Sequence, residues 1–424
     1  MKKYLEKLPQ EIRAIIAKLG ETARATRMPA YLVGGFVRDL ILGYKNLDLD
    51  VVVEGDGISY AQGLSQKLGG GLIIHKRFGT ATLDLKKNLK IDIATARKEH
   101  YPQPAHLPVV ICSILEDDLT RRDFTINSMA ISLNRDDFGD LVDCFKSAQD
   151  LKEKKIRVLH DLSFIDDPTR ILRAIRFEQR YGFRIEPRTL KLLKEANRLD
   201  MLHKVQPHRL RDELILMLNE DKPLKPLKRL KELIGFDFIR PGIKLSDKVI
   251  EDLKSIEKQI NWFRDAHAAH RQLEKWLMYF TGLLSQASSR DIRSICEKFA
   301  LRKGEEKRML AYKNTKPAFI RGLSRKDIKP SRLFGMLEPL SYENIVLLKA
   351  VFKNSSLRKN VEDFLKIYNG TRVHVTGEDL ARLGITPGPV YQKILRRVLK
   401  AKLDGRVETK EDELKLISKI AGKE

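Results

Sequence analysis

The chain has 424 residues and a formal net charge of +24, with 42% hydrophobic and 33% charged residues. This length exceeds one ordinary core and predicts two to four domains, while the composition excludes a disordered or membrane-embedded chain. No apolar run of membrane-spanning length, no signal segment and no paired-cysteine motif is visible, so a cytoplasmic protein without a membrane partner is expected. The excess of positive charge favours a polyanionic partner such as nucleic acid.

The first 140 residues predict a small mixed sheet flanked by helices. Six short runs rich in apolar and β-branched residues are separated by turn signals, as strands are. Two of these runs, 80–85 and 90–96, are joined by a short polar link and predict a hairpin. The six predicted strands lie within residues 31–35, 47–55, 71–76, 80–85, 90–96 and 126–133.

The turn before the second predicted strand has the features of a phosphate site. In "YLVGGFVRDLILG" a strand breaks at Gly34 and Gly35 into a helix that carries Arg38. Glycines let the backbone approach a ligand, amides at a helix start attract phosphate, and the Arg38 guanidinium can donate two parallel hydrogen bonds. We therefore interpret residues 31–43 as a phosphate cradle, although a glycine pair alone also occurs in many ordinary turns.

The second strand carries two closely spaced carboxylates. In "LDLDVVV", Asp48 and Asp50 project to the same face at the period of a strand. Such carboxylates repel each other unless a cation lies between them, and oxygen ligands select a hard ion such as Mg²⁺. The alternative is a solvent-facing edge strand with two aspartates of no special role. Two-metal phosphoryl transfer also predicts a third carboxylate, for which Asp92 in "KIDIATA" is preferred and Asp84 in "TLDLK" is the rival.

From residue 140 onward the pattern is helical almost to the end, with proline and glycine at the joints. The most informative helix lies in "DDPTRILRAIRF", where Asp167, Arg170 and Arg173 follow at spacing three. An ionised Asp only accepts hydrogen bonds and Arg only donates them. Cytosine and adenine present an amino donor beside a ring acceptor and fit such a pair, whereas uracil and guanine reverse the order. The alternative is an intrahelical salt bridge between Asp167 and Arg170.

A basic helix is predicted near the C-terminus, in "GITPGPVYQKILRRVLKAKLDGRV". Proline and glycine mark its start, and its positive side chains can contact phosphates along one flank. A solvated basic face without a ligand is the alternative. The basic residues of this helix are Lys393, Arg396, Arg397, Lys400 and Lys402.

Five motifs taken together resemble one known family. "LVGGFVRDLILG", "LDLDVVV", "RRDFTINSMA", "DDPTRILRAIRF" and "PHRLRDEL" follow one another over residues 31–215. In this order they resemble the class II tRNA nucleotidyltransferases, which include CCA-adding, A-adding and CC-adding enzymes and bacterial poly(A) polymerases. The C-terminal segment is similar to the tail of bacterial members, and the resemblance is weak only over residues 225–365. Asp166 stands where the family commonly has Glu, which we regard as a minor departure.

The resemblance implies an α+β protein with a polymerase-β-like nucleotidyltransferase head followed by an all-α neck, body and tail. The expected boundaries are 1–140 for the head, 141–225 for the neck, 226–365 for the body and 366–424 for the tail. Asp48 and Asp50 would hold Mg²⁺, and the three residues of the phosphate cradle would hold the triphosphate. Arg122 and Asp123, with Arg121, would hold phosphates and ribose. The remaining implied roles are the nucleotide base for Asp167, Arg170 and Arg173, support of the active site for Arg209 and Arg211, and tRNA for Lys393, Arg396, Arg397 and Lys400.

The expected reaction is template-independent synthesis or repair of the 3′-terminal CCA of tRNA from CTP and ATP, with release of pyrophosphate. Two alternatives stay open: an enzyme that adds only A and works with a separate CC-adding protein, or a poly(A) polymerase. Residues 97–115 occupy the place of the loop that the family uses to switch from C to A. This segment contains three prolines and does not decide between the alternatives.

Overall fold

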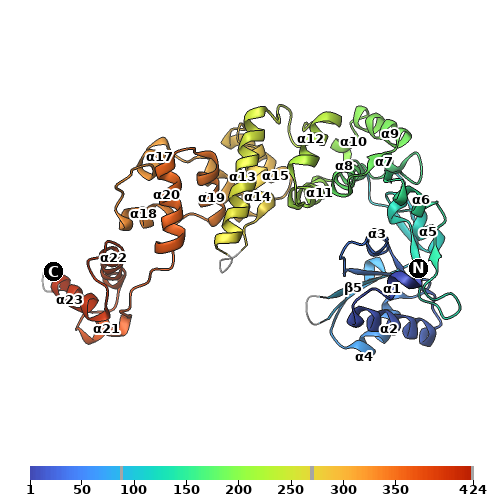
Figure 1. Ribbon diagram of the computed structural model, residues 1–424, viewed down its shortest axis with the longest axis horizontal. Coiled ribbons are helices and arrows are strands. Elements are labelled where there is room, and N and C mark those ends of the chain that lie inside the picture. The colour runs from blue at the N-terminus through green and yellow to red at the C-terminus, as the bar shows by residue number, and fades with distance from the viewer. Residues whose placement is uncertain (86–88, 268–271, 422–424) are drawn as a thin grey trace. The chain divides into compact units, whose positions relative to one another are not determined.

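The computed structural model describes residues 1–85, 89–267 and 272–421, and the chain divides into two compact units (Figure 1). The first unit comprises Met1–Glu220 and Lys228–Phe238, and the second comprises Asp221–Leu227 and Ile239–Glu424. The first unit contains a mixed sheet, and the described residues of the second unit are helical where they have regular structure. The predicted α+β class is therefore confirmed, while the finer division into four domains stays a prediction.

The sheet of the first unit has seven strands in the order β3-β4-β5-β2-β1-β8-β9. β2 and β5 are parallel, and the other neighbouring strands are antiparallel. Each of the six predicted strands overlaps one observed strand, and the predicted hairpin is β4–β5; its joining residues, 86–88, lie outside the described residues. The strands are β1 (Ala30–Val33), β2 (Leu49–Val53), β3 (Gly71–His75), β4 (Thr80–Asp84), β5 (Lys90–Thr95), β8 (Ala130–Ser132) and β9 (Leu141–Val142).

Two helices cover one face of this sheet, and α5 (Leu115–Thr120) packs on part of the other, where Leu115 and Leu119 form a buried cluster with Val52. Along β5, Ile91 and Ile93 are buried while Lys90 and Asp92 are exposed, which is the alternation of a strand covered on one side. The apolar face packs on α4 (Gly57–Leu68), which in turn packs on α2 (Gln10–Thr26). Polar positions of β2 and β5 are thereby left on the opposite face.

Two small pairings were not predicted. β6 (Arg97–His100) and β7 (Val109–Cys112) form an antiparallel hairpin within the segment that we expected to be a loop. Its proline-containing residues occupy only the connection between the strands. β10 (Lys155–Ile156) and β11 (Arg184–Ile185) form a parallel pair in the region expected to be helical. Each of these strands has only two residues, which is too few to show a hydrophobic period, so the sequence pattern could not predict them.

The remainder of the first unit is helical. The predicted motif helix is α8, which packs against α11, and its Ile171, Leu172, Ile175 and Phe177 are buried as expected. Prolines occupy the first turn of α9 and α11, where no intrahelical N–H is required. The other helices are α1 (Lys2–Leu5), α3 (Gly35–Leu42), α5 (Leu115–Thr120), α6 (Ser147–Lys152), α7 (Ser163–Asp166), α8 (Thr169–Tyr181), α9 (Pro187–Arg198), α10 (Met201–Lys204), α11 (Pro207–Asn219) and α12 (Leu224–Leu233), the last of which crosses into the second unit.

The second unit ends in a small bundle with its own apolar cluster, which includes Leu380, Ile394, Val398 and Ile417. Among the described residues, no helix is both long and apolar enough to cross a bilayer. The helices of this unit are α13 (Asp247–Ala266), α14 (Lys275–Leu283), α15 (Ser289–Lys298), α16 (Lys303–Lys313), α17 (Pro317–Leu323), α18 (Pro330–Leu337), α19 (Tyr342–Val351), α20 (Ser355–Asp363), the π-helical turn η4 (Phe364–Tyr368), α21 (Gly377–Arg382), α22 (Pro389–Leu403) and α23 (Lys410–Ala421).

Candidate active site

Two of the predicted carboxylates lie on neighbouring strands. Asp50 on β2 and Asp92 on β5 are register partners in the parallel pair, so both side chains are on the same face of the sheet, opposite the face that packs on α4. Asp48 immediately precedes β2 and is exposed. Asp84 lies at the end of β4, opposite Lys90 rather than opposite Asp92. The register therefore brings Asp92, and not Asp84, next to Asp50.

The electrostatics of Asp50 fit a bound cation. Burial raises the pKa of Asp50 to about 6; Arg122 opposes this shift, while the charges of Asp92 and Asp48 add to it. A divalent ion would offset both the lost hydration and the repulsion between the carboxylates. In the described chain without a bound ion, no three acidic, His or Cys side chains already converge on one metal position. The donor set, carboxylate oxygens, nevertheless suits a hard divalent cation.

Gly34 lies where the backbone passes closest to these groups. It has φ of +68°, which favours glycine, and it directly precedes α3. A Cβ atom built at this position would lie 2.8 Å from Nη1 of Arg122 and 3.6 Å from Oδ2 of Asp50. Any larger residue would therefore displace Arg122. At Gly35 the closest atom to such a Cβ is Nη2 of Arg38, at 3.4 Å.

Arg122 is the predicted phosphate-binding arginine nearest to Asp50. Its Nη2 donates to Oδ2 of Asp118 at 2.9 Å, and its Nη1 donates to the carbonyl of Asn127 at 3.4 Å. Its Nε is buried and has no partner among the described residues. Asp118 itself is fully buried, and the two arginines Arg121 and Arg122 hold its pKa below the ordinary value despite the opposing effect of burial. A guanidinium with unused donors thus sits beside Gly34.

Arg38 is held by neighbouring side chains instead of pointing freely into the site. Its Nε and Nη2 donate to Asp39 at 2.8 and 3.0 Å, and Nη1 donates to Oδ1 of Asn127 at 2.5 Å. The guanidinium also stacks over the ring of Tyr181, 4.7 Å from its centroid. Three of its five donors are thus used, and the side chain is buried. Because Tyr181 belongs to α8, the stacking of Arg38 on this ring connects α3 to α8. Its assignment to the triphosphate stays a prediction.

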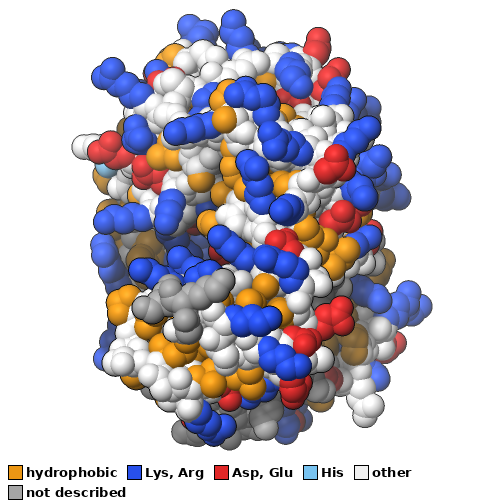
Figure 2. All heavy atoms as spheres, turned by 90° about the vertical axis from the view of Figure 1, so that its left-hand side faces the viewer, with side chains coloured by type: hydrophobic (Ala, Val, Ile, Leu, Met, Phe, Trp, Pro, Cys, Tyr) orange, Lys and Arg blue, Asp and Glu red, His pale blue; other side chains and the backbone are white. Residues whose placement is uncertain are grey.

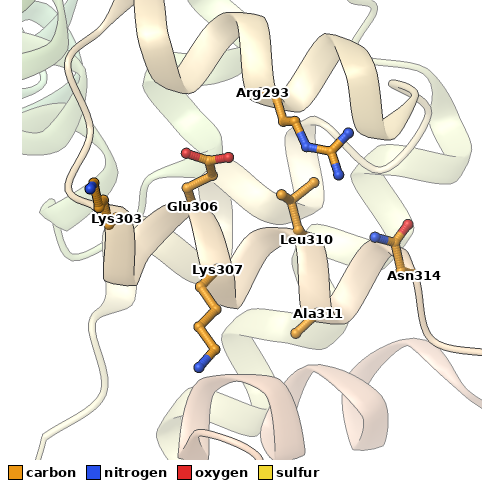
Figure 3. Close-up of a pocket in the computed structure, with 7 residues that line it drawn as sticks. All are labelled: Arg293, Lys303, Glu306, Lys307, Leu310, Ala311 and Asn314. Atoms are coloured by element: carbon orange, nitrogen blue, oxygen red, sulfur yellow. The ribbon is translucent and has the colours of Figure 1, made fainter.

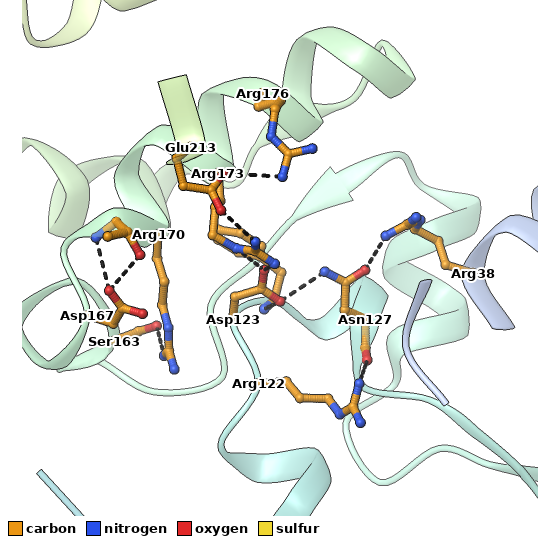
Figure 4. A network of polar contacts seen from close by, with 12 residues as sticks. Arg38, Arg122, Asp123, Asn127, Ser163, Asp167, Arg170, Arg173, Arg176 and Glu213 are labelled. Carbon is orange, nitrogen blue, oxygen red and sulfur yellow. Dashed lines mark hydrogen bonds and ion pairs between the residues drawn. The ribbon is translucent and has the colours of Figure 1, made fainter. Parts of the chain in front are cut away.

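Asp123 is also fully engaged within the protein (Figure 4). Its Oδ1 accepts from the amide of Phe124 and from Nδ2 of Asn127, at 2.8 and 2.9 Å. Its Oδ2 accepts from Nε and Nη2 of Arg173, at 2.8 and 2.6 Å. Arg173 continues the network, with Nη1 donating to Glu213 on α11 at 2.8 Å. A carboxylate has about four acceptor positions, so these bonds leave none for a ribose hydroxyl. The geometry favours a positioning role for Asp123 over the predicted contact with the sugar.

Asp167 and Arg170 do not form the intrahelical salt bridge that was the alternative interpretation. Oδ1 of Asp167 accepts from the amide and hydroxyl of Thr169, and Oδ2 accepts from Nη2 of Arg209 at 2.8 Å. Arg170 donates instead to Ser163 Oγ and to the carbonyl of Arg121, at 2.7 and 2.8 Å. These contacts leave one acceptor position on Oδ2 of Asp167 and three donors on Arg170. Both groups thus keep unused hydrogen-bonding positions, although the Arg170 side chain is buried.

Several residues of this network were not singled out from the sequence. Asn127 bridges Arg38 and Asp123, and Asp118 holds both Arg121 and Arg122. Asn127 is the last residue of "RRDFTIN", four positions after Asp123, and Asp118 lies three and four positions before Arg121 and Arg122; this short spacing is the only signal that could have identified them. The bond between Asn127 and Arg38 spans 89 positions and has no local signal. Glu213 lies within the quoted motif "PHRLRDEL". Its pairing with Arg173 joins positions 40 residues apart, which no local pattern indicates.

The predicted RNA-binding helix is α22. Lys393, Arg396, Arg397 and Lys400 are exposed, and their spacing places them along one face of the helix. Lysine and arginine side chains are spread over the face of the molecule shown in Figure 2, with fewer acidic side chains between them. Lys402 differs from this group because its Nζ donates to the buried Glu413 at 2.8 Å. It stabilises the bundle and is not part of the exposed stripe.

A hollow in the second unit contains none of the predicted site residues (Figure 3). It lies between α15 and α16 and is open to solvent. Its lining includes three cationic side chains, one carboxylate and two apolar side chains. It therefore contains neither an acid–base pair nor a cluster of carboxylates suited to catalysis. The lining residues are Arg293, Lys303, Glu306, Lys307, Leu310, Ala311 and Asn314.

Comparison with protein families identifies two regions. Residues 30–157 match the poly A polymerase head domain, and residues 182–245 match the probable RNA and SrmB-binding site of polymerase A. The first match covers the sheet with the carboxylates, Gly34 and Arg122. The second covers α11, which carries Arg209 and Glu213.

Similar proteins extend over nearly the whole chain. An A-adding tRNA nucleotidyltransferase of Geobacter sulfurreducens is 38% identical over 98% of this chain, which spans only 48% of that relative. An A-adding tRNA nucleotidyltransferase of Halalkalibacterium halodurans is 32% identical, with 94% of this chain and 90% of the relative covered. Among solved structures, the Thermotoga maritima CCA-adding enzyme complexed with tRNA_CCA has a TM-score of 0.72 and 36% identity, with 100% of this chain and 98% of that chain covered.

Proposed function

The chain belongs to the tRNA nucleotidyltransferase family, and we propose that it builds or repairs the 3′-terminal CCA of tRNA from CTP and ATP without a template. The observation that carries this proposal is the register of Asp50 and Asp92 on β2 and β5, beside Gly34 and Arg122. Carboxylates that can bind a metal thereby lie against a backbone turn and a guanidinium that can bind phosphate.

In the proposed reaction the terminal 3′-hydroxyl of the RNA attacks the α-phosphorus of the nucleotide. A new P–O bond forms, the bond to the β-phosphate oxygen breaks, and pyrophosphate leaves. Asp48, Asp50 and Asp92 would hold Mg²⁺, which when bound lowers the pKa of the attacking hydroxyl and stabilises the leaving pyrophosphate. Arg122 would donate to the triphosphate from the Nη N–H groups that Asp118 and Asn127 leave unused, and the small Gly34 leaves room beside Nη1 for this contact.

Base choice is assigned to Asp167 and Arg170. The unused acceptor position of Asp167 would receive the exocyclic amine, and Arg170 would donate to the adjacent ring nitrogen. Adenine and cytosine satisfy both groups. Uracil and guanine would place a carbonyl against the carboxylate and an N–H against the guanidinium, leaving desolvated groups unpaired. The fixed orientation of the two side chains, held by Arg209 and Ser163, replaces a nucleic-acid template.

A narrower second candidate is an enzyme that adds only the terminal A and works with a separate CC-adding protein. The two relatives described above, at 38% and 32% identity, carry the name A-adding. A donor and acceptor pair that accepts both adenine and cytosine does not by itself separate these two functions. Poly(A) synthesis would use the same chemistry on a different RNA.

The decisive experiment supplies the purified protein with tRNA lacking CCA, tRNA ending after the first C and tRNA ending after the second C, each with one nucleotide and Mg²⁺. Incorporation of CTP on the first two and ATP on the third supports CCA synthesis. Incorporation of ATP on the third alone identifies an A-adding enzyme, and long A tails identify a poly(A) polymerase. Absence of incorporation on every RNA would reject the proposed function.

A further inference from the structure

One part of the sheet face that carries the carboxylates is open to solvent. On β3, Gly71, Ile73 and His75 are exposed, and on β5 Lys90 and Asp92 are exposed. These positions lie opposite the face that packs on α4. We call this surface, formed by β3, β4 and β5, the open face. The proposed mechanism uses only Asp92 from it and leaves the rest without a role.

A continuous row of side chains crosses the open face to the carboxylates. Ile73 pairs with Thr82, Thr82 pairs with Asp92, and Asp92 pairs with Asp50. Register partners project to the same side of a sheet, so the row begins at the edge strand β3 and ends at Asp50. Within the row, Thr82 Oγ1 donates to Asp92 Oδ1 at 2.6 Å. Thr82 is thus a positioning residue for a proposed metal ligand.

The outer part of the open face has the chemistry of a site for single-stranded RNA. Ile73 is 55% exposed, and Phe78, three residues after the end of β3, is 54% exposed. Exposed Lys76 and Arg77 directly precede Phe78 in the turn that follows β3, and the Arg77 guanidinium lies 5.7 Å from the Phe78 ring centroid. Lys90 is exposed on β5, where its register partner on β4 is the exposed Asp84. Apolar and aromatic surfaces that accept bases, bordered by cations that accept phosphates, are typical of proteins that bind unpaired strands.

The side of Asp50 that faces β1 is already assigned to the triphosphate in the proposed mechanism. Gly34 and Arg122 lie on the β1 side of Asp50, where the triphosphate is proposed to bind. A transferase of this type must bring its acceptor hydroxyl to the same carboxylates from a different direction, in line with the leaving pyrophosphate. The open face begins at Asp92, on the side of Asp50 away from β1. It is therefore continuous with the reaction centre and is not covered by any described element.

We propose that the open face binds the unpaired 3′ end of the acceptor RNA. The terminal ribose lies at Asp92, the preceding phosphates lie near Lys90, Lys76 and Arg77, and a base packs on Ile73 and Phe78. This inference rests on the proposed nucleotidyltransferase function and adds the acceptor subsite to it.

A charge substitution with a matched control tests the proposal. Lys90→Ala removes a cation from the open face, and Lys67→Ala removes an exposed cation from α4, on the covered side of the sheet. With tRNA ending after the second C, Lys90→Ala is expected to raise the KM for tRNA about tenfold, as one lost charge-assisted bond does. The slope of log Kd against log salt is expected to fall by about 0.7. The KM for ATP should not change, and Lys67→Ala should match the wild type in all three measurements.

Crosslinking locates the RNA directly. The tRNA carries 4-thiouridine in place of the second C, and the crosslinked peptide is identified by mass spectrometry. Crosslinks within residues 71–84 support the proposal. Crosslinks confined to other parts of the chain, or equal KM values for Lys90→Ala and Lys67→Ala, overturn it. If the wild type incorporates no nucleotide, the proposed function fails instead, so the two failures are distinguishable.

Thr82 provides an independent readout. Thr82→Val removes the hydroxyl that binds Asp92 while keeping the shape of the side chain, and Thr82→Ser keeps the hydroxyl. A positioning role predicts a lower kcat for Thr82→Val at an unchanged KM for ATP, with recovery in Thr82→Ser. Equal kcat values for Thr82→Val and the wild type would remove Thr82 from the site.

Discussion

Asp167 accepts a hydrogen bond from Arg209 at 2.8 Å, although the two residues are 42 positions apart in the sequence. Arg170, only three positions from Asp167, binds Ser163 and the backbone of Arg121 instead. The two proposed base-reading side chains are therefore oriented by separate partners, one on α11 and one on α7. Each keeps unused hydrogen-bonding capacity, which a salt bridge between them would have consumed.

This arrangement predicts that Asp167→Ala impairs both rate and selectivity. The substitution removes the acceptor for the exocyclic amine, and kcat/KM for ATP is expected to fall by about 2 to 4 kcal/mol in transition-state stabilisation. Discrimination against GTP and UTP should decline with it. Single-turnover incorporation of the four nucleotides on tRNA ending after the second C measures both effects. Full preference for A over G in Asp167→Ala would place base choice elsewhere.

Arg209→Met separates orientation from direct contact. It leaves the Asp167 carboxylate in place but removes the partner that holds it, so the rate with ATP should fall less than in Asp167→Ala, by about 1 to 2 kcal/mol. Asp167 should still favour ATP over GTP in this variant. The same single-turnover assay applies. An Arg209→Met variant as unselective as Asp167→Ala would indicate that Arg209 itself contacts the base.

Asp50→Ala is expected to abolish incorporation, because it removes the central carboxylate of the proposed metal site. A loss of at least about a thousandfold in rate is expected for a metal ligand in phosphoryl transfer. Binding of tRNA depends mainly on basic surface and should be retained, which a filter-binding or anisotropy titration at constant salt can check. Retention of more than a few per cent of wild-type activity would contradict the assignment.

The buried network around Asp123 makes a prediction about stability. Burial raises the pKa of Asp123, but Arg173, Asn127 and Arg170 outweigh this effect and hold the pKa at about 2, below the ordinary 3.8. Its contribution to stability is therefore fully present above about pH 4 and is lost as the pH falls toward 2. Asp123→Asn leaves the Arg173 charge only partly paired and should lower the free energy of unfolding by about 3 kcal/mol at pH 7.

Thermal and urea unfolding of Asp123→Asn between pH 3 and pH 7 measures this effect. The difference from the wild type should begin to shrink below about pH 4, because the Asp123 carboxylate of the unfolded wild type takes up a proton near its ordinary pKa of 3.8, while that of the folded protein stays ionised down to about pH 2. Glu21→Gln is a suitable control, since its ion pair with Lys18 is at the surface and should have little influence. A difference that does not depend on pH would show that the lost stability arises from packing and not from charge.

The exposed stripe on α22 should govern affinity for tRNA without affecting nucleotide binding. Replacing Lys393, Arg396 and Lys400 by Ala is expected to raise the KM for tRNA and to reduce the salt slope of binding by about 0.9 for each lost contact with duplex phosphate. The KM for ATP should stay constant. Point variants suit this test better than deletion of the tail, because Asp404 binds the amide and hydroxyl of Ser331 and links α22 to α18.

Local sequence patterns were sufficient to predict most helices and strands and the chemical type of the side chains that they carry. Alternation in "LDLDVVV" and "KIDIATA" determined that Asp50 and Asp92 lie on the polar side of strands, and helical spacing determined the exposed stripe on α22. Proline and glycine marked where helices begin, because their backbone preferences act within one or two residues. The order of the five motifs identified the family for the same reason, since each motif is continuous in the chain.

Only the tertiary structure decided which of these charges remain available to a ligand. The sequence predicts ligand-binding roles for Asp123 and Arg38. In the structure, however, the acceptor positions of Asp123 are occupied by partners such as Arg173, and Arg38 is buried against Tyr181. Strand order likewise decided that Asp92, and not Asp84, is the neighbour of Asp50. The hydroxyl of Tyr181 donates to Asp39 although the two residues are 142 positions apart in the sequence. The partner of a buried charge depends on which groups lie near it in space and on the free-energy cost of leaving the charge unpaired. Neither quantity is encoded in local spacing.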